Sequence, residues 1–247
     1  MMKLHVINSN SKGNCYFLKD SSGKMLLLEC GVILQKIKEA VNFDLQNIVG
    51  CILTHEHGDH AKSAEPLSVF GVNIYTSPGT INALGFQSRR LKPIPEQVEQ
   101  EIGPFVVKPF NVKHDAAQPY GFLINHKEMG TTMFMTDTYY CEYNFGGLNN
   151  IIIEANYCEN IINEKLANAE TTGFVRDRVI QSHMSLQTCI NTLQAYDLTK
   201  VNNIVVIHLS DNNSDENLFY NEIKNATGKT VTIAVKGKII NLGKTPF

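Results

Sequence analysis

Short apolar runs bounded by Gly, Asn and Pro recur along the chain, and such runs favour β-strands. One of them, Val49–Leu53, predicts a buried strand that leads directly into a dense cluster of histidines and acidic residues at positions 55–60. The full set of predicted strands is Leu4–Ile7, Cys15–Leu18, Met25–Leu28, Val49–Leu53, Phe105–Val112, Tyr120–Ile124, Thr132–Met135, Ile151–Ile153, Ile204–Ile207 and Val231–Val235.

Helical periodicity lies between some of these runs. Val32–Phe43 places Ile33, Ile37 and Val41 on one face of a helix. Along the chain, a group of strands comes first and strands that alternate with helices follow, and this order of elements occurs twice. This order predicts the α/β class, with two sheets packed face to face and helices outside, a four-layer αββα sandwich. Further helices are predicted at Glu159–Asn168, at Leu186–Tyr196 and at Ser214–Ala226, the last with Ser214 as its N-cap.

Length and composition indicate an ordinary globular protein. The 247 residues show no repeat or composition break, so one domain spanning residues 1–247 is expected. The chain is 43% hydrophobic and 19% charged, a balance typical of soluble domains. No stretch approaches the roughly 20 apolar residues of a membrane span, and no secretory core follows Met1–Val6. We therefore expect a cytoplasmic protein that makes no membrane contact.

Charge and cysteine content narrow the picture further. The six cysteines form no C-x-x-C pair, and in a cytoplasmic chain we expect them to be reduced and mostly buried. The net charge is −2, so global charge gives no support for nucleic-acid binding. Binding to nucleic acid would need a local basic patch.

The segment that follows the predicted strand Val49–Leu53 reads, after Thr54, His55-Glu56-His57-Gly58-Asp59-His60. Its histidines and aspartate are nitrogen and oxygen donors that suit zinc, with manganese as the alternative. If the chain turns after His57 into a helix, His55 and His57 can share one ion while Asp59 and His60 face a second. A buried cluster of this kind needs a metal or partners, so a solvated loop is the weaker interpretation.

Three later donors also stand just beyond predicted strands, namely His114, Asp137 and His208. A lone histidine or aspartate at such a place is more often a cap or a core residue. Three of them at equivalent places, in a chain that already holds half a site, favour metal ligands instead.

The pattern His55-x-His57-x-Asp59-His60 resembles the signature of the metallo-β-lactamase fold, and the later donors follow in that family's order. The family usually has an aspartate in a supporting position where this chain has Glu29. None of the cysteines lies where true β-lactamases of the cysteine-ligand type hold their second ion. The resemblance implies two divalent ions, the first held by His55, His57 and His114, the second by Asp59, His60 and His208, with Asp137 bridging the two.

Two later motifs resemble those of the tRNase Z group. Ile153–Tyr157, which contains Glu154, resembles its His-Glu-Ala-Thr segment, and Ser182–Ser185, which contains His183, resembles its His-Ser-Thr segment. In that group the histidine protonates the leaving oxygen and the glutamate orients it. An imidazolium held by a carboxylate suits a poor alkoxide leaving group at pH 7. The resemblance implies catalytic roles for Asp59, His183 and Glu154, and a histidine in a polar loop before a helix is the alternative for His183.

Over its whole length the chain most resembles the YycJ-type (WalJ) metallo-hydrolases. This resemblance implies a nuclease that acts on DNA ends. Ser9–Cys15 resembles that family's first turn, Arg176–Ile180 its Arg-rich stretch, and His208–Asn213 its His-Leu-Ser tail. Ser182 and Met184 replace a glycine and a leucine of the family motif.

Arg176 and Arg178 are the predicted substrate-binding residues, because they stand close to His183 and can contact phosphates. Solvated surface charges are the alternative, as they are for the second basic cluster, Arg89–Lys92. No large β-CASP insertion is expected, because Asp137 and His208 lie too close in sequence to enclose one. No Gly/Pro-rich arm of the tRNase Z kind is present either.

The leading hypothesis is a dinuclear metal-dependent phosphodiesterase, a nuclease acting on DNA. Two bridged divalent ions lower the pKa of bound water and polarise a phosphoryl oxygen, which permits hydrolysis near neutral pH. The alternatives are a small-molecule esterase (a cyclic nucleotide phosphodiesterase or a thioesterase), an RNA-processing nuclease of the tRNase Z type, and a metal-binding sensor without activity. The complete ligand set argues against the sensor.

Overall fold

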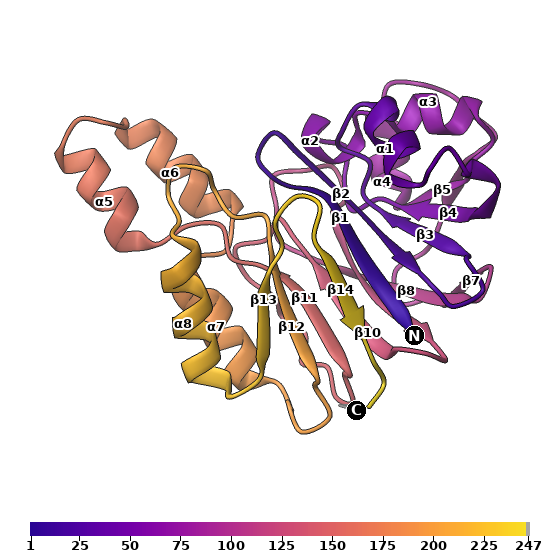
Figure 1. Ribbon diagram of the computed structural model, residues 1–247. Helices are drawn as coiled ribbons and strands as arrows, with labels where there is room; N and C mark the ends of the chain where they lie inside the picture. The colour runs from indigo at the N-terminus through magenta and orange to yellow at the C-terminus, as the bar shows by residue number, and fades with distance from the viewer. Residues whose placement is uncertain (246–247) are drawn as a thin grey trace.

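The computed structural model describes residues 1–245, which form two seven-stranded β-sheets with helices outside them (Figure 1). The first sheet contains β1 (Met2–Asn10), β2 (Gly13–Lys19), β3 (Met25–Leu28), β4 (Ile48–Ile52), β5 (Ile74–Thr76), β6 (Leu91–Pro93) and β14 (Ile239–Leu242). The second contains β7 (Gln100–Ile102), β8 (Phe105–Asn111), β9 (Tyr120–His126), β10 (Gly130–Met135), β11 (Asn150–Glu154), β12 (Asn203–Ile207) and β13 (Thr230–Ile233). The α-helices are α1 (Leu34–Ala40), α2 (Gly58–Ala61), α3 (Ala64–Val69), α4 (Pro78–Ala83), α5 (Glu159–Ala167), α6 (Gly173–Ser182), α7 (Leu186–Ala195) and α8 (Glu216–Thr227), with a 3-10 turn at Leu45–Asn47.

Each sheet combines an antiparallel part with a parallel part. The first sheet runs β14-β1-β2-β3-β4-β5-β6, and its strands are parallel from β3 to β6. The second runs β13-β12-β11-β10-β9-β8-β7, and its strands are parallel from β10 to β13. Parallel strands bring their carboxyl ends to one edge of a sheet, where ligands commonly bind. Most of the metal donors predicted from the sequence lie just beyond the carboxyl ends of strands in these two sheets.

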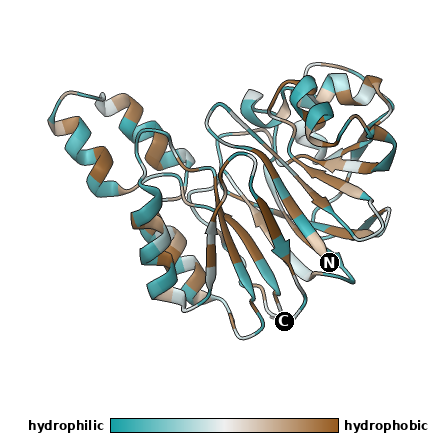
Figure 2. Ribbon diagram, in the orientation of Figure 1, coloured by the Kyte–Doolittle hydropathy of each residue, from teal (hydrophilic) through white to brown (hydrophobic). Residues whose placement is uncertain are grey.

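Strand alternation produces the four layers. In β11, Ile152 packs between the two sheets, whereas Ile151 and Ile153 face the outer helices. Side chains of successive strand residues point to opposite faces, so a strand covered on both sides is apolar throughout. Figure 2 shows this continuous hydrophobic character along the central strands of the second sheet. Apolar clusters on the outer faces join α7 and α8 to the second sheet and α1 and α3 to the first.

The predicted α/β four-layer sandwich is therefore confirmed, and all ten predicted strands are present with small shifts at their ends. Sequence patterns did not reveal β5, β6 and β7, because three residues are too few to display a period, or β14, whose four residues include the polar Asn241. Between Asp137 and His208 the chain forms β11, α5, α6, α7 and β12, with no inserted cap domain.

Two details of the predicted helices are wrong. Ile33 is not on the buried face of α1, because it precedes the helix in extended backbone and is 53% exposed. Ser214 is not the N-cap of α8. Asp215 takes that position, and its carboxylate accepts a hydrogen bond from the Leu218 backbone N–H at 2.7 Å. A carboxylate at this end also interacts favourably with the helix dipole.

The prediction for the cysteines is confirmed: all six are free, and all but Cys158 are buried. Among residues 1–245, no helix has the length and apolar character that crossing a bilayer demands.

Candidate metal centre

The predicted donors follow β4, β8, β10 and β12: Asp59 and His60 lie in the short helix α2, and the others lie in loops. The β4 strand ends at Ile52, and α2 then begins at Gly58 with His57 as its N-cap, so the chain turns within the histidine cluster as predicted. Short loops after rigid strands fix the backbone and let the side chains converge. The structure brings all seven predicted metal ligands together in two neighbouring sets.

The first set is His55, His57 and His114, whose ligand nitrogens lie within 4.8 Å of one another. His57 Nδ1 and His114 Nε2 are 3.2 Å apart. The Nδ1 atom of His55 lies 2.9 Å from the hydroxyl of Thr54, and its buried Nε2 has no hydrogen-bond partner in residues 1–245. One anchored nitrogen and one free nitrogen is the arrangement expected of a metal-binding imidazole.

The second set is Asp59, His60, His208 and Asp137. His60 Nε2 lies 3.3 Å from Asp59 Oδ2 and 3.3 Å from Asp137 Oδ1. His208 Nε2 lies 3.5 Å from Asp59 Oδ2 and is another buried nitrogen without a hydrogen-bond partner among the described residues.

Asp137 lies between the two sets. Its Oδ2 faces the first set, at 3.5 Å from His114 Nε2 and 3.8 Å from His55 Nε2. Its Oδ1 faces the second set, at 3.3 Å from His60 Nε2. The two oxygens of one carboxylate are thus directed at different donor groups, as a bridging ligand requires.

Buried partners hold the outer nitrogens of these imidazoles. Glu154 Oε1 is hydrogen-bonded to His208 Nδ1 at 2.8 Å, and Glu29 Oε2 faces His60 Nδ1 at an ion-pair distance of 3.4 Å. The Nδ1 atom of His114 lies 2.9 Å from the carbonyl oxygen of Ser182, the last residue of α6. Such partners set the tautomer and the ring orientation of a ligand.

The backbone of the site is strained at three non-glycine positions. Glu29, Asp137 and His208 have φ angles of 64°, 49° and 56°. The left-handed region is unfavourable for residues with a Cβ and costs about 1–3 kcal/mol at each position. All three follow strands, and the turn directs their side chains into the cluster.

The donor set fits a divalent metal ion on its charge as well as its geometry. Burial lowers the pKa of His55 well below its ordinary value, which keeps the imidazole in the neutral form that binds metals. Burial also disfavours charge on His208, yet Asp137, Asp59 and Glu154 raise its pKa to about 10. These facing carboxylates therefore attract positive charge to the cluster.

His183 and Glu154 form a hydrogen-bonded pair beside this cluster. His183 follows the end of α6, and its Nδ1 lies 2.7 Å from Glu154 Oε1. Burial disfavours the charged imidazole, but Glu154 outweighs this effect and raises the pKa of His183. Donor atoms of Asp137, Glu154, His183 and His208 also lie within 4.8 Å of one another, so a ligand role is the alternative for His183.

The structure separates the two predicted substrate-binding arginines. Arg178 lines a cavity of about 300 Å³ together with His57, Asp137 and other donors. Arg176 does not line this cavity. It stands two positions before Arg178 on α6, and side chains two positions apart in a helix point in directions that differ by roughly 200°. The guanidinium of Arg176 donates instead to Asp177 at 2.7 Å and to Asn163 at 2.8 Å.

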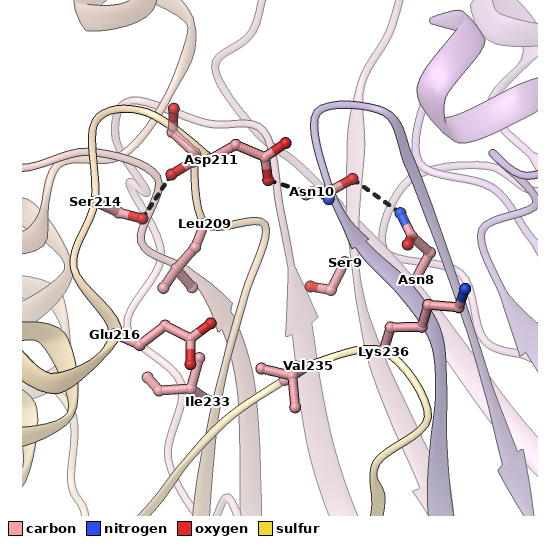
Figure 3. Close-up of a pocket in the computed structure, with 12 residues that line it drawn as sticks. Asn8, Ser9, Asn10, Leu209, Asp211, Ser214, Glu216, Ile233, Val235 and Lys236 are labelled. Carbon is pink, nitrogen blue, oxygen red and sulfur yellow. Dashed lines mark hydrogen bonds between the residues drawn. The ribbon is translucent and has the colours of Figure 1, made fainter.

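Sequence patterns missed several residues that position the site. The amide of Asn156 donates to the carbonyl oxygen of His208 at 2.8 Å, and the backbone N–H of His208 donates to Ser9 Oγ at 3.0 Å. A neighbouring pocket of about 420 Å³ lies between the segment that contains Ser9 and the segment that follows His208 (Figure 3). At this pocket the side-chain amide of Asn10 donates a hydrogen bond to Asp211 Oδ1 at 3.2 Å. Buried asparagines carry no periodic signal, so only the packed structure reveals these roles.

The fold and the donor sets define a metallo-hydrolase, and comparison with known proteins agrees. Residues 28–209 match the family described as the Beta-lactamase superfamily domain, so the chain belongs to this family. The chain is 28% identical over 177 residues to Exodeoxyribonuclease WalJ of Streptococcus pneumoniae. The match covers 65% of the chain and only 64% of that relative's length.

Solved structures of low sequence identity share the fold. The metallo-beta-lactamase fold protein YhfI from Bacillus subtilis has a TM-score of 0.76 at 18% identity, covering 98% of this chain and 100% of YhfI. The short form of human tRNase Z has a TM-score of 0.63 at 16% identity, covering 97% of this chain and 99% of that one. Family and relatives together support a metal-dependent hydrolase.

Proposed function

We propose that the protein is a dinuclear metal-dependent phosphodiesterase, a nuclease that hydrolyses DNA. The observation that carries this proposal is the position of Asp137, whose two oxygens face two separate donor sets. The relative named as an exodeoxyribonuclease supports DNA as the substrate. Three apolar clusters that span the sheets and helices support a single hydrolase domain over residues 1–247.

His55, His57 and His114 would hold the first ion, Asp59, His60 and His208 the second, and Asp137 both. The histidine-rich donor set suits zinc, with manganese as the alternative. When bound, such a pair of ions activates water for attack and stabilises the charge that develops on the phosphoryl oxygens.

The chain's own residues supply the remaining steps. His183 donates a proton to the leaving oxygen, and Glu154 holds the imidazole at 2.7 Å and keeps it protonated. An alkoxide is a poor leaving group, so proton donation contributes most when DNA is the substrate. Arg178 lines the cavity beside the donors and binds a phosphate of the substrate.

A substrate panel tests this proposal. Purified protein is assayed on bis(p-nitrophenyl) phosphate, on DNA and RNA oligonucleotides and on thioesters, each with and without a chelator. We expect chelator-sensitive hydrolysis of the diester and of DNA. Hydrolysis of thioesters alone would replace the proposal with the small-molecule esterase, and a preference for RNA would replace it with the tRNase Z-like nuclease.

A further inference from the structure

One face of α6 forms the wall of a second pocket, of about 540 Å³, beside the metal centre. Residues 174, 177, 178 and 181 share this face, because helix positions three and four apart are neighbours. Residues from the loops after β8 and β10 form the opposite side. The pocket, called here the α6 pocket, is lined by His114, Asp115, Tyr139, Phe174, Asp177, Arg178, Gln181 and Ser182.

Two aromatic side chains of the α6 pocket are unusually open to solvent. Phe174 is 80% exposed and Tyr139 is 47% exposed. Exposure of apolar surface is unfavourable in water, and clustered exposed aromatics mark binding sites. Core packing does not explain Phe174, because Ser182 is the buried residue of α6 and the helix stands away from both sheets (Figure 1).

The α6 pocket is continuous with the metal centre. Phe174, Arg178 and His114 line both this pocket and the cavity that contains the metal donors. The carbonyl of Ser182 lies 2.9 Å from His114 Nδ1, which ties the end of α6 to a metal ligand. A substrate whose phosphate reaches the donors therefore extends directly over Phe174.

The residue types around this pocket suit one part of a nucleic acid. Aromatic rings stack on the faces of bases without reading their sequence, and arginine binds the adjoining phosphate. In a duplex both faces of an internal base are already stacked, so a ring on the protein can stack only on an unpaired or terminal base. Arg178 lies one helical turn from Phe174, which places a cation beside the aromatic surface.

We infer that the α6 pocket binds an unpaired nucleobase adjacent to the scissile phosphate, with Phe174 as its stacking surface. This inference rests on the proposed nuclease function and adds to it the substrate form, a single strand or a frayed end. Tyr139 closes the pocket from the opposite loop, and Arg178 orients the phosphate between the base and the metal centre.

The inference is tested by combining a substitution in the protein with the removal of single bases from the substrate. The metal-loaded wild type and Phe174→Ala are assayed on single-stranded DNA oligonucleotides that carry one abasic nucleotide at successive positions. On intact DNA, Phe174→Ala should lower kcat/KM by about 5- to 150-fold, the range that corresponds to loss of one base–aromatic stack. On the oligonucleotide abasic at the contacted position, the same substitution should change kcat/KM by less than about twofold, because the stack is already absent.

Two further variants make the result specific. Phe174→Trp should restore hydrolysis of intact DNA, since a larger ring also stacks. Phe70→Ala removes a different exposed phenylalanine, which lies next to α3 and outside the pocket, and should leave kcat/KM unchanged. Metal content and hydrolysis of bis(p-nitrophenyl) phosphate are recorded for every variant.

The possible failures are distinguishable. Equal losses for Phe174→Ala on intact and abasic oligonucleotides at every position, in a wild type that hydrolyses DNA, would overturn the stacking site and leave the nuclease intact. A wild type that hydrolyses neither DNA nor the small diester would overturn the proposed function and this inference together.

Discussion

The metal centre and the α6 pocket share a wall but differ in burial. His55 and His60 at the metal centre are fully buried, and Asp137 is 2% exposed, whereas Phe174 in the α6 pocket is 80% exposed. At the metal centre, the imidazoles of His55 and His208 are hydrogen-bonded to the buried side chains of Thr54 and Glu154. Helix α6, in contrast, buries little of its own surface. Chemistry requires donors held in fixed positions, and recognition of a flexible strand requires accessible surface. The two regions should therefore respond differently to substitution.

Loss of the bridging carboxylate should have the largest effect. Asp137→Ala should reduce turnover of DNA and of the small diester alike by more than about 10³-fold, because it removes charge stabilisation worth several kcal/mol. Elemental analysis should show less metal per chain. The matched control Asp44→Ala changes an exposed aspartate outside the site and should alter neither quantity. Wild-type turnover in Asp137→Ala would remove Asp137 from the centre.

His183→Ala should separate proton donation from metal binding. DNA hydrolysis should fall by about 10²- to 10⁴-fold, the usual contribution of a general acid. Hydrolysis of bis(p-nitrophenyl) phosphate should fall much less, because p-nitrophenolate leaves without a proton. Equal losses on both substrates, together with less bound metal, would show that His183 is a ligand.

Glu154→Gln should have a smaller and broader effect than the His183 change. The carboxylate lies 2.7 Å from His183 Nδ1 and 2.8 Å from His208 Nδ1, so it supports both the proton donor and a metal ligand. We expect a loss of about 10- to 100-fold in activity on both substrates, as for other partners of metal ligands. A loss confined to DNA would limit Glu154 to the proton donor.

The smallest effect is expected at the arginines. Arg178→Ala should weaken DNA binding and reduce the slope of log affinity against log salt concentration by about 0.7 on single strands, which corresponds to one phosphate contact. Arg176→Ala is the matched control, because its guanidinium is already bound to Asp177 and Asn163. Equal slopes for the two variants would place Arg178 outside the substrate path.

The difference between the two regions also explains what the sequence could predict. The donors of the metal centre are dense or directly follow apolar strands, so His114, Asp137 and His208 could be identified before their spatial arrangement was known. The contact of Glu154 with both His183 and His208 could not be predicted. It depends on the register of β11 against β12, which places Glu154 opposite Ile207 and so beside His208. Helix α6 could not be predicted either, since it lacks the apolar stripe that marks a packed helix.

Titration of metal-stripped protein with zinc tests the central claim of two metal ions most directly. Hydrolysis of bis(p-nitrophenyl) phosphate is followed as zinc is added in known equivalents per chain, with elemental analysis of the washed protein at the end. Two bound ions and activity that reaches its maximum near two equivalents are the predicted result. Full activity in the stripped protein, or activity complete with one bound ion, would contradict the dinuclear centre.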